Sequence, residues 1–307
     1  MNEPRAIGID GLRWAVRSAG AGPALLLLHG FTGSGSSWVG GLAEAAVAAG
    51  FATILPDLPG HGGTAWRAGG TAWRADEPAA SRVGDPAAWR AGDPAGRADS
   101  SRATVEAIAD DLPALLAELG HRRAHVVGYS MGARVALRLA IVHPARVARL
   151  VLEAPSAGIA DPGERAARRV ADDSLAMTLE RDGIGPFIDA WERTPVLAGE
   201  ARLGVDARVA LREIRASHDP AGLAASLRAA GHGAMEPLHG RLREVRAPTL
   251  VIVGAEDPAR ERAAAVAARI RGARLAVIDG AGHAPHLEVP AAFQDLVLEF
   301  ISEEHAA

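Results

Sequence analysis

The sequence of 307 residues contains no cysteine and no lysine. Without cysteine, the chain has no disulfide, no thiolate metal site and no cysteine nucleophile. Without lysine, it has neither a Schiff-base residue nor the phosphate-binding lysine of a P-loop, and all 33 basic residues are arginines. These absences exclude disulfide-stabilised folds, cysteine hydrolases and lysine-dependent catalysis.

A strong net charge and long apolar segments are also missing. The formal net charge is −4, which gives no sign of a nucleic-acid or polyanion partner. No apolar run approaches the roughly 20 residues of a membrane span, and residues 1–5 lack the layout of a signal peptide. We therefore expect a cytoplasmic protein that binds neither nucleic acid nor membrane, while nothing in the sequence indicates its oligomeric state.

One short segment organises the chain. The mostly apolar segment Ala124-His125-Val126-Val127 leads into Gly128-Tyr129-Ser130-Met131-Gly132, and an Ala/Leu/Val-rich helical segment, 133–142, follows. This Gly-x-Ser-x-Gly pattern is typical of a nucleophile elbow, a strand-to-helix turn so tight that only small residues fit two positions either side of the serine. It predicts that the Ser130 hydroxyl projects above the sheet edge, beside the positive end of the next helix.

The remaining pattern predicts an α/β fold. Strands are expected at 12–18, 24–28, 51–55, 147–153, 249–253 and 275–278, and helices at 42–49, 104–119, 261–270 and 291–302. This alternation is typical of a doubly wound, mostly parallel sheet, which binds ligands at the carboxyl ends of its strands. Residues 155–242 have a helical pattern throughout, so we expect a helical cap inserted into a core of residues 1–154 and 243–307.

Residues 64–103 interrupt this pattern. Thr-Ala-Trp-Arg-Ala at 64–68 recurs at 71–75, and Ala-Trp-Arg-Ala recurs at 88–91, in a segment rich in Gly, Pro, Asp and Arg. The composition favours a low-complexity, mobile surface insertion without function. The alternative is a stacking or lid surface built from the Trp–Arg pairs.

Two further residues complete a catalytic triad with Ser130. Asp257 follows the strand at 249–253 and His283 follows the strand at 275–278, so the order Ser, Asp, His is the one expected on this sheet. Glu256 is an alternative acid. His286 and Glu288 favour a role in the loop, and we expect His61, on a Pro/Gly turn, to stabilise that turn rather than act as the base.

Backbone donors for a developing oxyanion are expected at two turns. The strand 24–28 ends in His-Gly-Phe-Thr-Gly at 29–33, where glycines free the backbone to face a ligand. The N–H groups of Phe31 and Met131 are the candidate donors. A plain strand-to-helix turn at 29–33 is the alternative.

These motifs resemble the α/β-hydrolase superfamily over nearly the whole chain. The resemblance rests on His29 to Gly33, Asp57 to Gly62, the Ser130 elbow and Gly280 to His283. A narrower resemblance joins the segments 128–137, 152–158, 164–169, 187–191, 222–228 and 286–290. Together they are similar to the 2-succinyl-6-hydroxy-2,4-cyclohexadiene-1-carboxylate synthase family of menaquinone biosynthesis.

This resemblance implies a lyase that eliminates pyruvate from 2-succinyl-5-enolpyruvyl-6-hydroxy-3-cyclohexene-1-carboxylate without cofactor or metal. The Ser130–His283 pair would abstract a proton. The small anionic substrate would meet arginine, whose planar donor fork suits carboxylates. The substrate-binding residues implied are Tyr129, Arg134, Arg168, Trp191 and, on a less close match, Arg215.

Four features depart from the family pattern. Ala133 replaces a glycine, Pro-Ala-Arg at 258–260 stands where Lys-Phe is common, Gly-His-Gly at 231–233 replaces Gly-Thr-Gly, and the insertion at 64–103 is atypical. A serine carboxylesterase, thioesterase or C–C hydrolase with Ser130 as nucleophile is the alternative enzyme. A binding module on the same fold is the non-enzymatic alternative, against which the complete triad argues.

Overall fold

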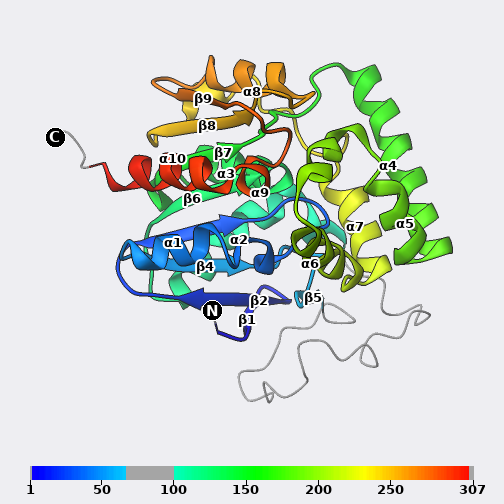
Figure 1. Cartoon of the computed structure of the whole chain (residues 1–307), viewed down its shortest axis with the longest axis horizontal. Coiled ribbons are helices and arrows are strands. Elements are labelled where there is room, and N and C mark those ends of the chain that lie inside the picture. Colours follow the sequence, from blue (N-terminus) through cyan, green and yellow to red (C-terminus); the bar gives the residue numbers. More distant parts are fainter. Residues whose placement is uncertain (1, 67–99, 304–307) are drawn as a thin grey trace.

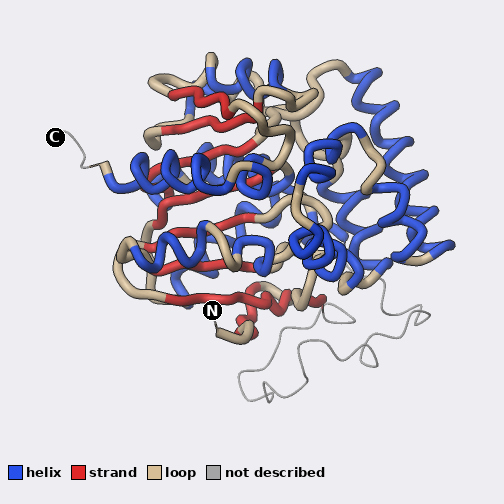
Figure 2. The backbone as a smooth tube through the Cα atoms, in the orientation of Figure 1, coloured by secondary structure: helices blue, strands red, loops and turns tan. Residues whose placement is uncertain are grey.

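The computed structural model describes residues 2–66 and 100–303. Among these residues, nine strands form one sheet in the order β1-β2-β4-β3-β6-β7-β8-β9, with β5 paired to β2. The strands are β1 (Arg5–Ile9), β2 (Leu12–Ala19), β3 (Ala24–Leu28), β4 (Ala52–Pro56), β5 (Ala65–Trp66), β6 (Ala124–Tyr129), β7 (Val147–Glu153), β8 (Thr249–Gly254) and β9 (Arg274–Ile278). From β4 to β9 along the sheet every pairing is parallel, whereas β1, β2 and β5 pair antiparallel. The predicted mostly parallel sheet is confirmed (Figures 1 and 2).

Helices cover both faces of the sheet. The helices of the core are α1 (Leu42–Ala48), α2 (Val105–Glu118), α3 (Met131–Val142), α8 (Arg260–Ala267), α9 (Pro285–Glu288) and α10 (Pro290–Ser302). In Figure 1, α1 and α10 lie in front of the sheet and α2 and α3 lie behind it. Successive side chains of a strand point to opposite faces of the sheet, so each strand contributes to both hydrophobic layers. In β3, Leu26 and Leu28 pack with α2 and α3, while Leu25 and Leu27 pack with α1 and α10.

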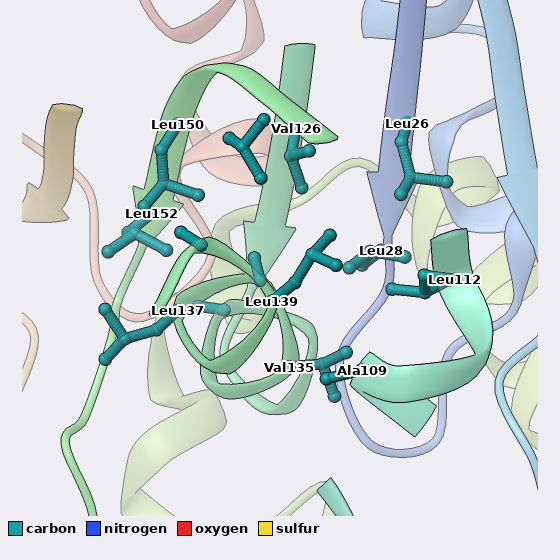
Figure 3. Packing of buried hydrophobic residues seen from close by; sticks show 14 of the residues in the cluster. Leu26, Leu28, Ala109, Leu112, Val126, Val135, Leu137, Leu139, Leu150 and Leu152 are labelled. Carbon is teal, nitrogen blue, oxygen red and sulfur yellow. The ribbon is translucent and has the colours of Figure 1, made fainter. Parts of the chain in front are cut away.

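The helix after the elbow packs along the middle of the sheet. Figure 3 shows Val135 and Leu139 of α3 beside Leu28 of β3 and the α2 residues Ala109 and Leu112. These side chains are fully buried, and burial of apolar area on this scale is the main stabilising term of such a core. The Ser130 turn is therefore fixed at both ends by buried elements.

Four helices form a separate layer over the carboxyl ends of the strands. They are α4 (Pro162–Asp182), α5 (Ile184–Trp191), α6 (Val205–Ala216) and α7 (Pro220–Ala230). Figure 1 shows these helices at the right of the sheet. Their own buried cluster contains Leu179, Phe187 and Leu223, and Phe31 of the core packs against it. None of the helices in the described residues is long and apolar enough to cross a membrane.

The structure adds two features to the predicted elements. The strand β1 was not expected, because its pattern is only partly buried and it lies at the edge of the sheet. At the start of the expected insertion, Thr64 is buried, and its hydroxyl donates to the Asp57 carbonyl and accepts from the Ala15 N–H. A short 3-10 helix, Ser100–Ala103, precedes α2. The rest of the Trp–Arg repeats, residues 67–99, lie outside the described residues.

Candidate active site

The turn between β6 and α3 has the geometry of a nucleophile elbow. Ser130 adopts a φ of 51°, in the left-handed region that non-glycine residues rarely occupy. A Cβ atom at Gly128 would lie 2.4 Å from the Gly132 carbonyl oxygen, and one at Gly132 would lie 2.2 Å from the Leu28 carbonyl oxygen. Only glycine fits at either position, which explains the sequence pattern in physical terms.

The three predicted triad residues lie within hydrogen-bonding distance of one another. His283 Nε2 is 3.1 Å from Ser130 Oγ, and His283 Nδ1 is 2.9 Å from Asp257 Oδ2. The second oxygen of Asp257 accepts the Ala259 N–H at 2.7 Å. Burial alone would raise the pKa of Asp257, but hydrogen bonds and the neighbouring His283 outweigh it and hold that pKa below its usual value. The carboxylate is thus charged and can orient the imidazole, as triad chemistry requires.

The two candidate oxyanion donors flank Ser130. Met131 begins α3, and Phe31 lies in the turn after β3. In the described residues neither N–H has an acceptor outside its own element. Gly30 gives the Tyr129 ring room, because a Cβ there would lie 2.6 Å from it. The Phe31 ring meets Trp191 edge-on at 5.3 Å between centroids, which ties this turn to α5.

A cavity of about 440 Å³, which we call the main cavity, opens above the triad. Ser130, His283, Phe31, Met131 and Tyr129 line it, and so do the predicted Arg134, Arg168 and Trp191. A further arginine, Arg262, lines it as well. Among the described residues that line it, three are arginines and none is aspartate or glutamate. The main cavity therefore suits an anion with several negative charges.

Arg134 and Arg168 keep free donors toward this cavity. Arg134 uses one guanidinium nitrogen on the Ala230 carbonyl at 2.6 Å. Burial, and then the charge of Arg168, lower the pKa of Arg134 to about 10, so it stays charged at neutral pH. Arg168 donates from Nε to Asp172 at 2.8 Å, and its side chain remains 44% exposed. The two terminal nitrogens of Arg168 are left for a ligand.

Arg215, unlike Arg134 and Arg168, does not line the main cavity. It lines a smaller cavity of about 40 Å³, the side cavity, which shares Phe31, Tyr129 and Leu197 with the main cavity. There its buried guanidinium binds both oxygens of Glu200, at 2.6 and 2.9 Å, and Glu192 at 3.2 Å. Two carboxylates thus already neutralise the third predicted arginine, behind the wall of the main cavity.

The alternative residues weighed from the sequence are engaged elsewhere. The Glu256 carboxylate binds Arg202 at 2.7 Å, and Glu288 accepts the Gly282 and Ala284 N–H groups. His61 is buried in its loop, near the Pro59 carbonyl. Within the described residues, no group of three or more histidine, aspartate or glutamate side chains is placed to hold a metal ion.

Two polar pairs near the site were missed by sequence reasoning. His286 Nδ1 and its backbone N–H both bind the buried Glu153 carboxylate, and the His286 ring lies 4.6 Å from Tyr129. His232 Nε2 lies 2.6 Å from Ser156 Oγ on the wall of the main cavity. Both pairs join segments far apart in the sequence, so spacing along the chain could not indicate them.

Comparisons of the sequence and of the structure with known proteins both find relatives with the α/β-hydrolase fold. A model of the alpha/beta hydrolase fold matches residues 23–290. The putative 2-succinyl-6-hydroxy-2,4-cyclohexadiene-1-carboxylate synthase of Bacillus subtilis is 32% identical to this chain over 95% of it and 96% of its own length. MenH from S. aureus has a TM-score of 0.76 at 27% identity, covering 93% of this chain and 97% of its own. A malate-bound thermophilic esterase from Thermogutta terrifontis has a TM-score of 0.74 at 26% identity, covering 97% and 98%. With this match over most of its length and the sheet and elbow described above, the chain belongs to the α/β-hydrolase fold family.

Proposed function

We propose that this protein eliminates pyruvate from 2-succinyl-5-enolpyruvyl-6-hydroxy-3-cyclohexene-1-carboxylate, giving 2-succinyl-6-hydroxy-2,4-cyclohexadiene-1-carboxylate. The observation that carries the proposal is the main cavity, where Ser130 and His283 of the Ser–His–Asp arrangement line the wall together with three arginines and, among the described residues, no aspartate or glutamate. An enzyme for neutral esters has no need of this charge. The similarity to the Bacillus subtilis protein, named as a putative synthase of this product, supports the same assignment.

The reaction begins with removal of the ring proton at C2, next to the succinyl ketone. Ser130 takes this proton as His283 accepts the serine proton, and the charged Asp257 stabilises the imidazolium that results. The C3=C4 double bond gives way to C2=C3 and C4=C5, and the C5–O bond breaks. Enolpyruvate leaves, and a proton returned to its methylene carbon makes pyruvate.

Negative charge develops on the ketone oxygen in the first step. The backbone N–H groups of Phe31 and Met131 are the donors we assign to it, since both flank Ser130 and neither has an acceptor outside its own element in the described residues. Arg134 and Arg168 would bind two substrate carboxylates. Trp191 and Tyr129 would contact the substrate ring. Arg215, which Glu192 and Glu200 hold in the side cavity, is not assigned a substrate carboxylate.

The same proposal covers the whole chain. Residues 1–154 and 243–307 form the catalytic core and residues 155–242 the cap, with a small-molecule substrate and no nucleic-acid or membrane partner. A cytoplasmic location fits an enzyme of menaquinone biosynthesis. No cofactor is required, because both the base and the oxyanion donors come from the protein.

The test is to follow pyruvate release from the enolpyruvyl substrate. We expect Ser130→Ala to lower kcat by about 100-fold or more, and Arg134→Ala to raise KM by about tenfold. Arg138→Ala is the matched control, because Arg138 lies one turn further along α3 and binds Glu236 at 2.8 Å outside the cavity. It should behave as wild type.

The second candidate is ester hydrolysis with Ser130 as nucleophile, which the fold of the Thermogutta esterase and the 3.1 Å Ser130–His283 distance favour. Turnover of p-nitrophenyl esters that requires Ser130 but not Arg134, with no pyruvate from the enolpyruvyl substrate, would replace the lyase assignment by this one.

A further inference from the structure

We propose that Arg262 and His232 form a carboxylate subsite at the edge of the main cavity, which binds the third carboxylate of the substrate. This inference rests on the proposed function for the identity of the substrate. Neither residue belongs to the set that the sequence patterns indicate, and both line the main cavity. They come from different layers, since Arg262 lies on α8 of the core and His232 follows α7 of the cap.

The Arg262 guanidinium has no direct partner among the described residues, although its charge helps to lower the pKa of Asp257. It makes no hydrogen bond or ion pair to any of the described residues. It also occupies the first turn of α8, where the helix dipole disfavours a positive charge. An arginine in this position is therefore able to bind an anion.

His232 supplies a neutral donor beside it. Ser156 Oγ accepts the Gly158 N–H at 3.1 Å and lies 2.6 Å from His232 Nε2. We assign the serine hydroxyl as the donor in this contact, which places the ring proton of the neutral His232 on Nδ1. Burial, followed by the charges of Arg134, Arg168 and Arg262, lowers the pKa of His232 to about 3, consistent with a neutral ring surrounded by arginines. Its Nδ1–H is thus available to a carboxylate oxygen.

The number of charges also agrees with a subsite here. The proposed substrate carries three carboxylates, on the ring, the succinyl group and the enolpyruvyl group. The main cavity presents Arg134, Arg168 and Arg262, while Arg215 is held by Glu192 and Glu200 in the side cavity. Arg262 is therefore the cation that the third carboxylate can reach.

The subsite lies at a boundary between cavities. Arg262 and Ser156 also line a neighbouring cavity of about 430 Å³, whose wall includes Asp161 and Glu164. Neither of these carboxylates is within ion-pair distance of Arg262.

The experiment compares Arg262→Ala with Arg271→Ala, which removes the same charge from an exposed turn that lines none of these cavities. With the enolpyruvyl substrate, we expect KM to rise about tenfold in Arg262→Ala, with kcat within about twofold of wild type. Arg262→Lys should recover part of the affinity. The thermal midpoint of Arg262→Ala should not fall below that of wild type, because the removed charge opposes the helix dipole.

A second measurement is independent of turnover. Calorimetric titration with citrate, a simple tricarboxylate, should give a Kd about tenfold weaker for Arg262→Ala and unchanged for Arg271→Ala. If wild type releases pyruvate but the two variants have equal KM and equal citrate affinity, the subsite is wrong and the proposed function stands. If citrate binding depends on Arg262 but no pyruvate forms, the subsite stands and the proposed function is wrong. Absence of both citrate binding and turnover in wild type overturns both.

Discussion

Two adjacent carboxylates near His283 have different partners. Asp257 is buried and binds His283 and the Ala259 N–H, whereas Glu256 is 54% exposed on its side chain and binds Arg202. A one-residue step along the loop thus separates a carboxylate that orients the base from one that forms a surface ion pair. A surface pair of this kind contributes little to stability.

Replacing Asp257 by asparagine tests this difference. Asp257→Asn keeps the size of the side chain but removes the charge that favours the productive tautomer of His283, so we expect kcat to fall by about 1,000-fold or more. Glu256→Gln, the matched control, should stay within about twofold of wild type. Steady-state kinetics of both variants measures this, and equal losses would mean that either carboxylate can serve the triad.

At the scale of single residues, the sequence could indicate only those site residues whose positions follow from short motifs around them. The elbow at Ser130 and the loops carrying Asp257 and His283 have short motifs whose geometry follows from neighbouring residues. The roles of Arg215 and Arg262 depend instead on tertiary packing between separate elements. Arg215 meets Glu200 across a buried contact, and Arg262 lines the main cavity without a partner among the described residues.

At the scale of elements, the packing of α3 against β3 depends on one glycine. Gly132→Ala would place a Cβ 2.2 Å from the Leu28 carbonyl oxygen, in backbone that cannot move without shifting the sheet. We expect the free energy of unfolding to fall by at least about 2 kcal/mol.

Gly240→Ala gives the opposite expectation for a comparison glycine. Gly240 lies in an exposed turn outside the left-handed region, and a Cβ there meets no atom within 4 Å beyond its chain neighbours, so the added methyl should stabilise the protein by about 0.5 kcal/mol. Urea denaturation of both variants measures the two changes. A Gly132→Ala protein as stable as wild type would contradict the elbow packing described here.

The elements themselves were largely predictable, because their signals are periodic. The buried strand β3 is a continuous apolar run, and β8 is one after its first residue, Thr249. The strand β7 is apolar except for Arg149 and Glu153, and α2 has apolar residues at helical spacing with Thr104 as its N-cap. The helix α3 begins two residues earlier than expected, at Met131, because the elbow turn leads directly into it. The edge strand β1 has no continuous apolar run, and its pairing with β2 gives it its conformation.

At the scale of the whole molecule, three buried histidines lie where the layer of α4 to α7 meets the loops of the sheet. His29 follows β3, His61 follows β4, and His218 follows α6. His218 Nδ1 accepts the Gly62 N–H at 3.0 Å, and its Nε2 donates to the Thr32 carbonyl at 2.9 Å. Burial lowers the pKa of His29 and of His218 to about 4, and that of His61 also lies well below its usual value.

These shifts predict acid sensitivity. Below the usual histidine pKa of 6.5 the unfolded chain binds protons that the folded protein does not, so stability is complete above pH 6.5 and falls as the pH decreases toward 4. The slope should approach about 1.4 kcal/mol per pH unit for each histidine. Asp57, whose pKa burial raises, acts in the opposite direction as it takes up a proton.

Thermal midpoints measured from pH 8 to pH 4.5 test this dependence. His218→Gln retains a donor and an acceptor but cannot titrate, so its midpoint should change less with pH than that of wild type. His121→Gln, a matched histidine variant outside the group of three, should keep the wild-type slope. Parallel curves for wild type and His218→Gln would contradict the assignment.

The main cavity also determines the ionic conditions that favour the enzyme. The chain carries a formal charge of −4, yet the wall of this cavity has three guanidinium groups and no carboxylate among its described residues. Dissolved chloride and phosphate would compete for these groups, and added salt would screen the field that draws a polyanion inward. Substrate capture should therefore weaken with rising ionic strength, whereas the proton transfer between Ser130 and His283, across a direct contact of 3.1 Å, should change much less.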